Sequence, residues 1–177
     1  MLQFQTRNDF IASLPTGMIM CEVGVFQGDF SKTLYHQSPL ELHLIDIFSG
    51  YMCSGDKDGL NIKCTMMENE YDKLKKYFNK NNVFLHKGDG NEIMNKFPDE
   101  YFDFIYIDAD HSYDSVLSNL NTALPKLKPF GILSGHDYNA QQFPGLVDAV
   151  NKFCKHNGLQ IIIIANDMLP TFAIKKT

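Results

Sequence analysis

A run of apolar residues ends, within positions 104–116, in a cluster of polar side chains with the sequence FIYIDADHSYDSV. Asp108 and His111 are the members of this cluster that could do chemistry. Carboxylates bind divalent cations, and histidine, with an ordinary pKa of about 6.5, can accept a proton near neutral pH. Asp110 and Ser112, in contrast, are typical helix-capping residues. The stretch therefore predicts either a catalytic edge or a capped loop that leaves a buried strand.

Strand-like and helix-like segments alternate along the chain and would position these residues. Between most of the strand-like runs, apolar residues recur every three or four positions, as in Ile62–Phe78 and Tyr113–Leu124. Strands separated by helices are typical of a parallel sheet covered on both faces. The predicted strands are Met18–Val23, Leu42–Ile47, Asn82–His86, Phe102–Asp108, Gly131–Ser134, Gln160–Ala165 and Leu169–Ile174.

The last two predicted strands break the alternation. Only the residues NDM separate them, too few for a crossover helix, so the two strands should be antiparallel neighbours. We therefore expect an α/β fold: a doubly wound, Rossmann-like, seven-stranded sheet, mostly parallel, with an antiparallel C-terminal hairpin strand. No linker divides the chain, which predicts a single domain over residues 1–177 with a short N-terminal helix, about Thr6–Leu14, within residues 1–15.

Composition excludes several classes of partner. The net charge is −5, and no Lys/Arg run exceeds a pair, which argues against nucleic-acid and membrane surfaces. The four cysteines lie far apart without a Cys-x-x-Cys spacing, so reduced thiols are expected rather than zinc or disulfides. The start of the chain lacks the pattern of a signal peptide, and the longest apolar run, residues 159–165, is too short to span a bilayer. A cytoplasmic protein is expected.

A glycine motif, MCEVGVFQGDFSKTL, follows the first long strand at residues 20–34. Gly24 and Gly28 allow the backbone to turn and approach a ligand without a Cβ, and a helix from about Asp29 would direct N–H groups at that ligand. Phe26 occupies the position of the second glycine in Gly-x-Gly-x-x-Gly, so a pyrophosphate cradle is poorly supported. A plain strand-to-helix turn is the alternative.

Acidic residues end the next three strands. Asp46 follows Gly24 by about 20 residues, a spacing that suits an acid binding the two hydroxyls of a ribose. Asp89 ends the third of these strands and Asp108 the fourth. Because the carboxyl ends of parallel strands form the ligand-binding edge of open α/β sheets, four such endings in succession favour a nucleotide-type cofactor.

With these motifs the chain resembles a class I S-adenosylmethionine-dependent methyltransferase over nearly all of its length. The resemblance implies that Glu22, Gly24 and Gly28 hold the amino-acid end of the cofactor. It also implies that Asp46 binds the ribose and that Asp89 lies beside the adenine amine.

The segment from Asp108 to the GHDY sequence is similar to the branch that contains macrolide-sugar and related small-molecule O-methyltransferases. Catechol and caffeoyl-coenzyme A O-methyltransferases carry Asp-x-x-Lys where this chain has Asp108-x-x-His111. The resemblance implies that Asp108 binds a divalent metal, Mg²⁺ or Mn²⁺, and touches the cofactor, and that His111 is a general base. His136 and Asp137 would complete the metal site.

The His136-Asp137 pair departs from the Glu-Asp or Asp-Asn that relatives usually have. Imidazole suits Mn²⁺, Fe²⁺ or Zn²⁺ better than Mg²⁺, so a different metal, a site of Asp108 and Asp137 alone, and no metal all remain open. Asp108 could instead cap the strand, and His136 could make a structural hydrogen bond. His111 could simply begin the following helix.

The sequence thus predicts an S-adenosylmethionine-dependent O-methyltransferase for a small hydroxylated acceptor, such as a sugar, with metal assistance. Tyr113 and Tyr138 would line the acceptor site or pack in the core, and residues 48–59, with Phe48 and Tyr51, would cover the cofactor. Little sequence precedes the core, so either the acceptor is small or a partner subunit completes the acceptor site, which makes a homo-oligomer one hypothesis. The rivals are a cofactor-binding protein without turnover, an N-methyltransferase, and an NAD-type oxidoreductase, which Phe26 and the C-terminal hairpin disfavour.

Overall fold

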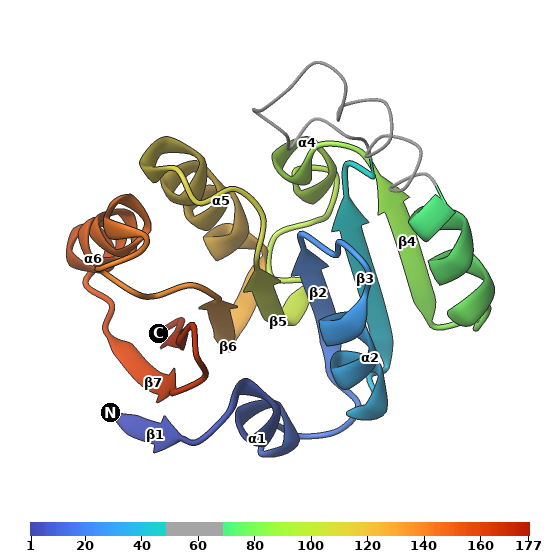
Figure 1. The fold of residues 1–177 in the computed structure, drawn as a ribbon, viewed down its shortest axis with the longest axis horizontal. Coiled ribbons are helices and arrows are strands. Elements are labelled where there is room, and N and C mark those ends of the chain that lie inside the picture. The colour runs from blue at the N-terminus through green and yellow to red at the C-terminus, as the bar shows by residue number, and fades with distance from the viewer. Residues whose placement is uncertain (49–68) are drawn as a thin grey trace.

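The computed structural model describes residues 1–48 and 69–177. In these residues eight strands form one sheet in the order β1-β7-β8-β6-β5-β2-β3-β4 (Figure 1). The strands are β1 (Leu2–Phe4), β2 (Ile19–Val23), β3 (Glu41–Asp46), β4 (Val83–Lys87), β5 (Phe102–Ile107), β6 (Leu127–Gly135), β7 (Ile161–Ala165) and β8 (Thr171–Lys175). The helices are α1 (Arg7–Ala12), α2 (Asp29–His36), α4 (Gly90–Met94), α5 (Tyr113–Lys126), α6 (Pro144–Asn157) and a further helix over residues 69–77.

All strands run parallel except β8, which lies antiparallel between β6 and β7. The predicted α/β fold and the antiparallel pairing of the last two strands are therefore confirmed. β2 lies between β3 and β5, so the sheet changes its winding direction there, and Val23 is level with both Ile45 and Ile107. Open α/β sheets bind ligands beside the carboxyl ends of strands at such a switch point.

The sheet has one strand more than the sequence predicted, because Leu2–Phe4 add a parallel edge strand next to β7. The three residues are largely exposed and too few to show an alternating pattern, so only the pairing with β7 makes them a strand. The chain then enters α1 through Thr6. The Thr6 hydroxyl accepts a hydrogen bond from the Asp9 amide at 3.1 Å, and the Asp9 carboxylate accepts one from the Thr6 amide at 3.0 Å.

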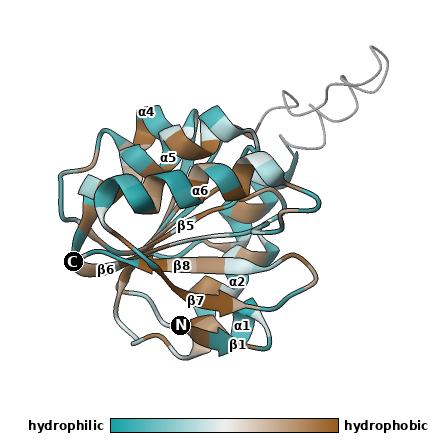
Figure 2. Cartoon of the chain, turned by 90° about the vertical axis from the view of Figure 1, so that its left-hand side faces the viewer, coloured by the Kyte–Doolittle hydropathy of each residue, from teal (hydrophilic) through white to brown (hydrophobic). Residues whose placement is uncertain are grey.

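Helices cover both faces of the sheet and bury a hydrophobic core on each. Figure 2 shows α4, α5 and α6 on one side of the sheet, with α1 and α2 on the other. No helix in the described part of the chain is long and apolar enough to cross a membrane. The first core includes Ile105, Ile107, Val116, Leu120, Val150 and Phe153; the second includes Phe10, Met20, Phe30, Leu34, Phe104 and Tyr106.

Candidate active site

The carboxylate of Asp46, at the end of β3, binds the backbone of the glycine-motif loop. Its Oδ2 accepts hydrogen bonds from the amides of Val25 at 2.7 Å and Phe26 at 2.9 Å, and its Oδ1 accepts one from Phe48 at 2.7 Å. Amide groups that a pyrophosphate would need are thus bound to a carboxylate of the protein itself. The geometry agrees with the sequence argument against a dinucleotide-type phosphate site.

Phe26 occupies the tip of this loop in a backbone conformation that favours glycine. Its φ angle is +52°, and its side chain is 61% exposed. A left-handed conformation costs an L-residue about 1–2 kcal/mol. The backbone at Phe26 therefore adopts a left-handed conformation that glycine favours, although the residue is a phenylalanine.

The two glycines of the motif are required by contacts within the protein. A Cβ added to Gly24 would lie 1.9 Å from the carbonyl oxygen of Asp108, so the ends of β2 and β5 touch through their backbones. Gly28 has a φ of +76° at the N-cap of α2, and a Cβ there would lie 2.3 Å from Cδ2 of Leu74. A tight strand-to-helix turn therefore accounts for both glycines before any ligand is considered.

Glu22 and Asp89 have different environments. Glu22 is buried and accepts a hydrogen bond from the Ser31 hydroxyl. Burial raises the pKa of Glu22 well above its usual range, and the Ser31 hydrogen bond offsets only part of that effect. Asp89 is exposed and caps α4 by accepting the Glu92 amide at 2.9 Å. α4 and α5 border a small cavity beside the ends of β2 and β5, lined by Val23, Gly90, Asn91, Met94, Ile107, Asn119 and Ala123.

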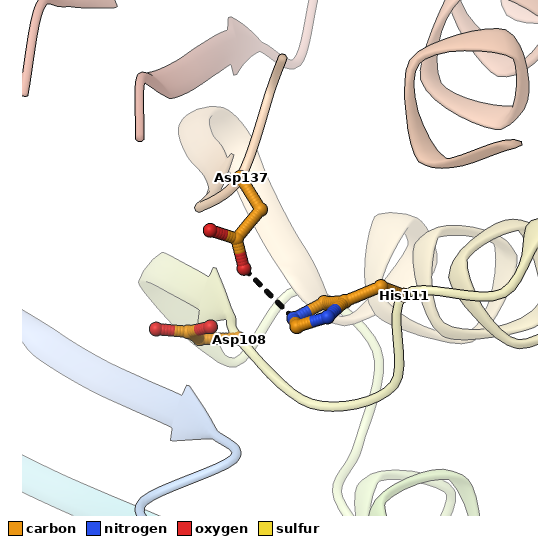
Figure 3. Close-up of side chains that lie close together, drawn as sticks. All are labelled: Asp108, His111 and Asp137. Carbon is orange, nitrogen blue, oxygen red and sulfur yellow. Dashed lines mark ion pairs between the residues drawn. The ribbon is translucent and has the colours of Figure 1, made fainter. Parts of the chain in front are cut away.

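Two aspartates and a histidine converge at the ends of β5 and β6, as Figure 3 shows. Asp108 follows β5, His111 lies in the loop before α5, and Asp137 lies in the loop after β6. Nε2 of His111 is 2.8 Å from Oδ2 of Asp137, and one ligand atom from each of the three residues lies within 4.8 Å of the others. Because β5 and β6 are adjacent parallel strands, their following loops meet at one edge.

His136 borders the same cluster. Its Nδ1 lies 3.0 Å from Oδ1 of Asp137 and 3.7 Å from Oδ2 of Asp108. Among the described residues, no group makes a hydrogen bond of acceptable geometry to that buried Asp137 oxygen. The structure thus brings together Asp108, His136 and Asp137, as the sequence predicted for a metal site. It adds His111, which the resemblance had assigned to catalysis alone.

Charge pairing in the cluster changes the proton affinity of its members. The carboxylates of Asp108 and Asp137, next to the imidazole, stabilise its protonated form and raise the pKa of His111 to about 10. Burial by itself would raise the pKa of Asp137, but the neighbouring imidazoles of His111 and His136 hold that pKa well below its usual range. With a pKa of about 10, His111 is protonated at neutral pH in this arrangement of side chains. The ordinary pKa of about 6.5 assumed from the sequence does not apply.

Sequence reasoning missed one side chain at this edge, Arg7. Nη1 of Arg7 lies 3.8 Å from Oδ2 of Asp108, and the guanidinium carbon lies 4.7 Å from the centre of the Phe30 ring. Arg7 is the first residue of α1, and the β1 strand that leads into this helix had no pattern to predict it. Residue spacing alone therefore could not place Arg7 beside β5.

The aromatic residues proposed for the acceptor and cofactor mostly have partners within the protein. The Tyr138 hydroxyl donates to Oδ1 of Asn151 at 2.8 Å, which favours its packing role. Tyr113 lies under the ammonium of Lys152, whose Nζ is 5.5 Å from the ring centre. Phe48 is fully buried in the core, and the rest of the predicted covering loop lies outside the described residues.

The strand order, the switch point and the polar strand ends define a doubly wound domain with a ligand site at its carboxyl edge. A family model described as a methyltransferase domain, Methyltransf_24, matches residues 21–138. The chain therefore belongs to this methyltransferase family. No curated protein matches the chain by sequence.

Solved structures of methyltransferases share the fold. SMU.1697c from Streptococcus mutans, solved with SAH, has a TM-score of 0.67 and 15% identity over 97% of this chain and 96% of that one. The O-methyltransferase NovP has a TM-score of 0.67 and 17% identity over 97% and 79%. An rRNA methylase from Streptococcus thermophilus has a TM-score of 0.64 and 12% identity over 96% and 93%. The family model therefore identifies the chain as a methyltransferase domain, and these structures show that it has the fold of methyltransferases.

Proposed function

We propose that the chain transfers a methyl group from S-adenosylmethionine to a hydroxyl group of a small acceptor, assisted by a divalent cation. The observation that carries this proposal is the convergence of Asp108, His111 and Asp137, with ligand atoms within 4.8 Å of one another, beside the glycine-motif loop. The similarity in fold to NovP, an O-methyltransferase, supports the same reaction class.

The donor set fits a divalent cation. Asp108 and Asp137 supply carboxylate oxygens, and the buried Oδ1 of Asp137 has no hydrogen-bond partner among the described residues. His136, whose Nδ1 lies 3.0 Å from Oδ1 of Asp137, adds a histidine nitrogen, which favours Mn²⁺, Fe²⁺ or Zn²⁺ over Mg²⁺. A cation bound there would polarise the acceptor hydroxyl and lower its pKa.

The cofactor is assigned to the ends of β2, β3, β4 and β5, where Glu22, Gly24, Asp46, Asp89 and Asp108 lie. The loop amides that bind Asp46 hold its carboxylate in a fixed orientation. A carboxylate has about four acceptor positions, and three amides occupy three of them, so Asp46 keeps one position for a ribose hydroxyl. Gly28 begins α2 at the same edge.

His111 is the proposed acceptor of the hydroxyl proton. Asp108 and Asp137 hold a proton on the imidazole, because their carboxylates stabilise its protonated form and raise its pKa. The base role therefore requires these two carboxylates to engage another group first. Phe143, whose ring centre is 4.6 Å from that of His111, restricts the orientation of the imidazole.

Calorimetric titration of the metal tests the proposal. Wild-type protein is expected to bind S-adenosylhomocysteine in EDTA, and to bind Mn²⁺ after EDTA is removed. Asp137→Asn should weaken Mn²⁺ binding at least about tenfold, because it removes a charged ligand. Asp99→Asn is the matched control, since Asp99 is an exposed aspartate that pairs with Lys126 outside the site.

A catechol probe then tests the acceptor side. Mn²⁺ should be required for catechol to bind in the presence of S-adenosylhomocysteine. If S-adenosylhomocysteine binds but titration with Mn²⁺ and with catechol gives no heat of binding, the proposal of metal-assisted O-methylation is wrong. The assignment as a methyltransferase would still stand.

Replacing Asp46 by alanine is expected to weaken both the fold and cofactor binding. Three amides lose their acceptor, which should lower the free energy of unfolding by about 1–3 kcal/mol, measured by urea unfolding. The ribose loses the acid that binds it, which should weaken the binding of S-adenosylhomocysteine by about 1–3 kcal/mol, measured by titration. Asp29→Ala serves as the control, because Asp29 is exposed on α2 and pairs only with Lys32 in a surface contact. Unchanged affinity in Asp46→Ala would contradict the ribose assignment.

A further inference from the structure

Arg7 is the only arginine in the 177-residue chain, in which every other basic side chain with a fixed charge is a lysine. Its guanidinium lies over the Phe30 ring, with Nη1 3.8 Å from Oδ2 of Asp108, and its side chain is 29% exposed. Arginine differs from lysine in its planar fork of donors, which matches a carboxylate, and in its ability to stack on an aromatic ring.

The far edge of the sheet holds Arg7 in place. The Arg7 amide donates to Oδ2 of Asp167, in the turn between β7 and β8, at 2.7 Å. The Asn166 amide donates to the carbonyl of Phe4 at 3.0 Å, next to the pairing of β1 with β7. Arg7 also precedes the segment that matches the family model, residues 21–138. The chain thus supplies a fixed cation to the edge of β5 from outside the matched region.

The charges at this edge suit a zwitterion. Glu22, Asp108 and Asp137 are acids that can receive an ammonium group, but a carboxylate ligand needs a cation. His111 and His136 each have a ring nitrogen within 3.0 Å of an Asp137 oxygen. Arg7, in contrast, is 3.8 Å from the nearest carboxylate oxygen of residues 1–48 and 69–177, which is longer than a hydrogen bond.

The guanidinium therefore has donors to offer. It carries five N–H groups, and its neighbours at the site are the Tyr106 hydroxyl and the Asp108 carboxylate. The Tyr106 hydroxyl is already within 3.0 Å of the Thr171 hydroxyl.

We propose that Arg7 binds the α-carboxylate of the methionyl part of the cofactor and makes the site selective for ligands that retain this group. The inference rests on the proposed placement of the cofactor at the ends of β2 and β5. A residue of the N-terminal segment would then contact the ligand directly and help to determine which ligands bind.

Calorimetric titration with S-adenosylmethionine and with its decarboxylated analogue, without acceptor, tests this role. The wild type should bind S-adenosylmethionine about 10- to 100-fold more tightly than the analogue, as expected for a hydrogen-bonded charge pair. Arg7→Met should lose that factor for S-adenosylmethionine and leave the analogue within about threefold. Arg7→Lys should keep part of the preference, because it retains charge but not the planar fork.

Lys175→Met is the matched control, since Lys175 also lies over a phenylalanine ring, at 5.5 Å from the centre of Phe130, on β8. It should bind both ligands as the wild type does. Equal affinity of the wild type for both ligands would overturn the inference without any variant. An equal loss of affinity for both ligands in Arg7→Met would also overturn it, because it would show that Arg7 only supports Asp108. If the wild type binds neither ligand, the proposed cofactor site itself is wrong.

Discussion

Gly24→Ala is expected to lower the free energy of unfolding by about 2–5 kcal/mol. Gly24 has a φ of +91°, where an L-residue costs about 1–2 kcal/mol, and its new Cβ would lie 1.9 Å from the Asp108 carbonyl oxygen and 2.8 Å from the Ala109 amide nitrogen. These are backbone atoms, so no side chain can turn away, and forced displacement of packed groups adds about 1–3 kcal/mol. Urea unfolding measures the effect.

Gly17→Ala separates the two causes. Gly17 has a similar φ of +74°, but a Cβ there would meet no atom within 4 Å. Its loss of stability should therefore stay within the conformational cost of about 1–2 kcal/mol. Equal losses at the two positions would show that the contact between β2 and β5 yields at little cost. Because the displaced backbone belongs to Asp108, Gly24→Ala should also weaken metal binding.

Asp108→Asn is expected to reduce turnover by at least about 100-fold while cofactor affinity stays within about threefold. The substitution keeps the size of the side chain but removes the charge that faces Arg7 and His136. Loss of a positioned catalytic group typically costs 10²–10⁴-fold in rate, or about 3–5 kcal/mol of barrier. Single-turnover rates and S-adenosylhomocysteine titration measure the two quantities separately.

Asp110→Asn provides the comparison from the same loop. Oδ1 of Asp110 accepts the Ser112 amide at 2.6 Å, the residue is exposed, and it is not among the three residues whose ligand atoms converge. Asparagine supports such turns nearly as well as aspartate, so turnover should remain within about threefold of the wild type. Retained turnover in Asp108→Asn would return Asp108 to a capping role, and the acidic cluster would then be a polar loop.

The strand ends could be predicted from sequence because each follows a run whose burial is evident in the residues themselves. The apolar run before Asp108 and the short connection between β7 and β8 both carry local signals, and both were confirmed. The meeting of Asp108 with Asp137 follows from the adjacency of β5 and β6, which the βαβ order implies. Local pattern and topology rules were sufficient for this much.

Other features depend on contacts that no local pattern encodes. β1 is three residues long and becomes a strand through its partner, so neither the strand nor Arg7 could be placed from the sequence. The proton on His111 depends on two carboxylates from different loops. Phe48 looked like a loop aromatic available to a ligand, but it is buried against Tyr71, with ring centres 4.9 Å apart.

The pairing of β1 with β7 also has a consequence for the order in which contacts form during folding. Leu2 pairs with Ile163, so the two partners are 161 positions apart in the sequence. Contacts of such long sequence separation are costly to form early, because the intervening chain must be ordered before they repay its entropy. We therefore expect β2, β3 and β5 to pair before Arg7 comes close to Asp108. The acidic edge would then exist before the cation that balances it.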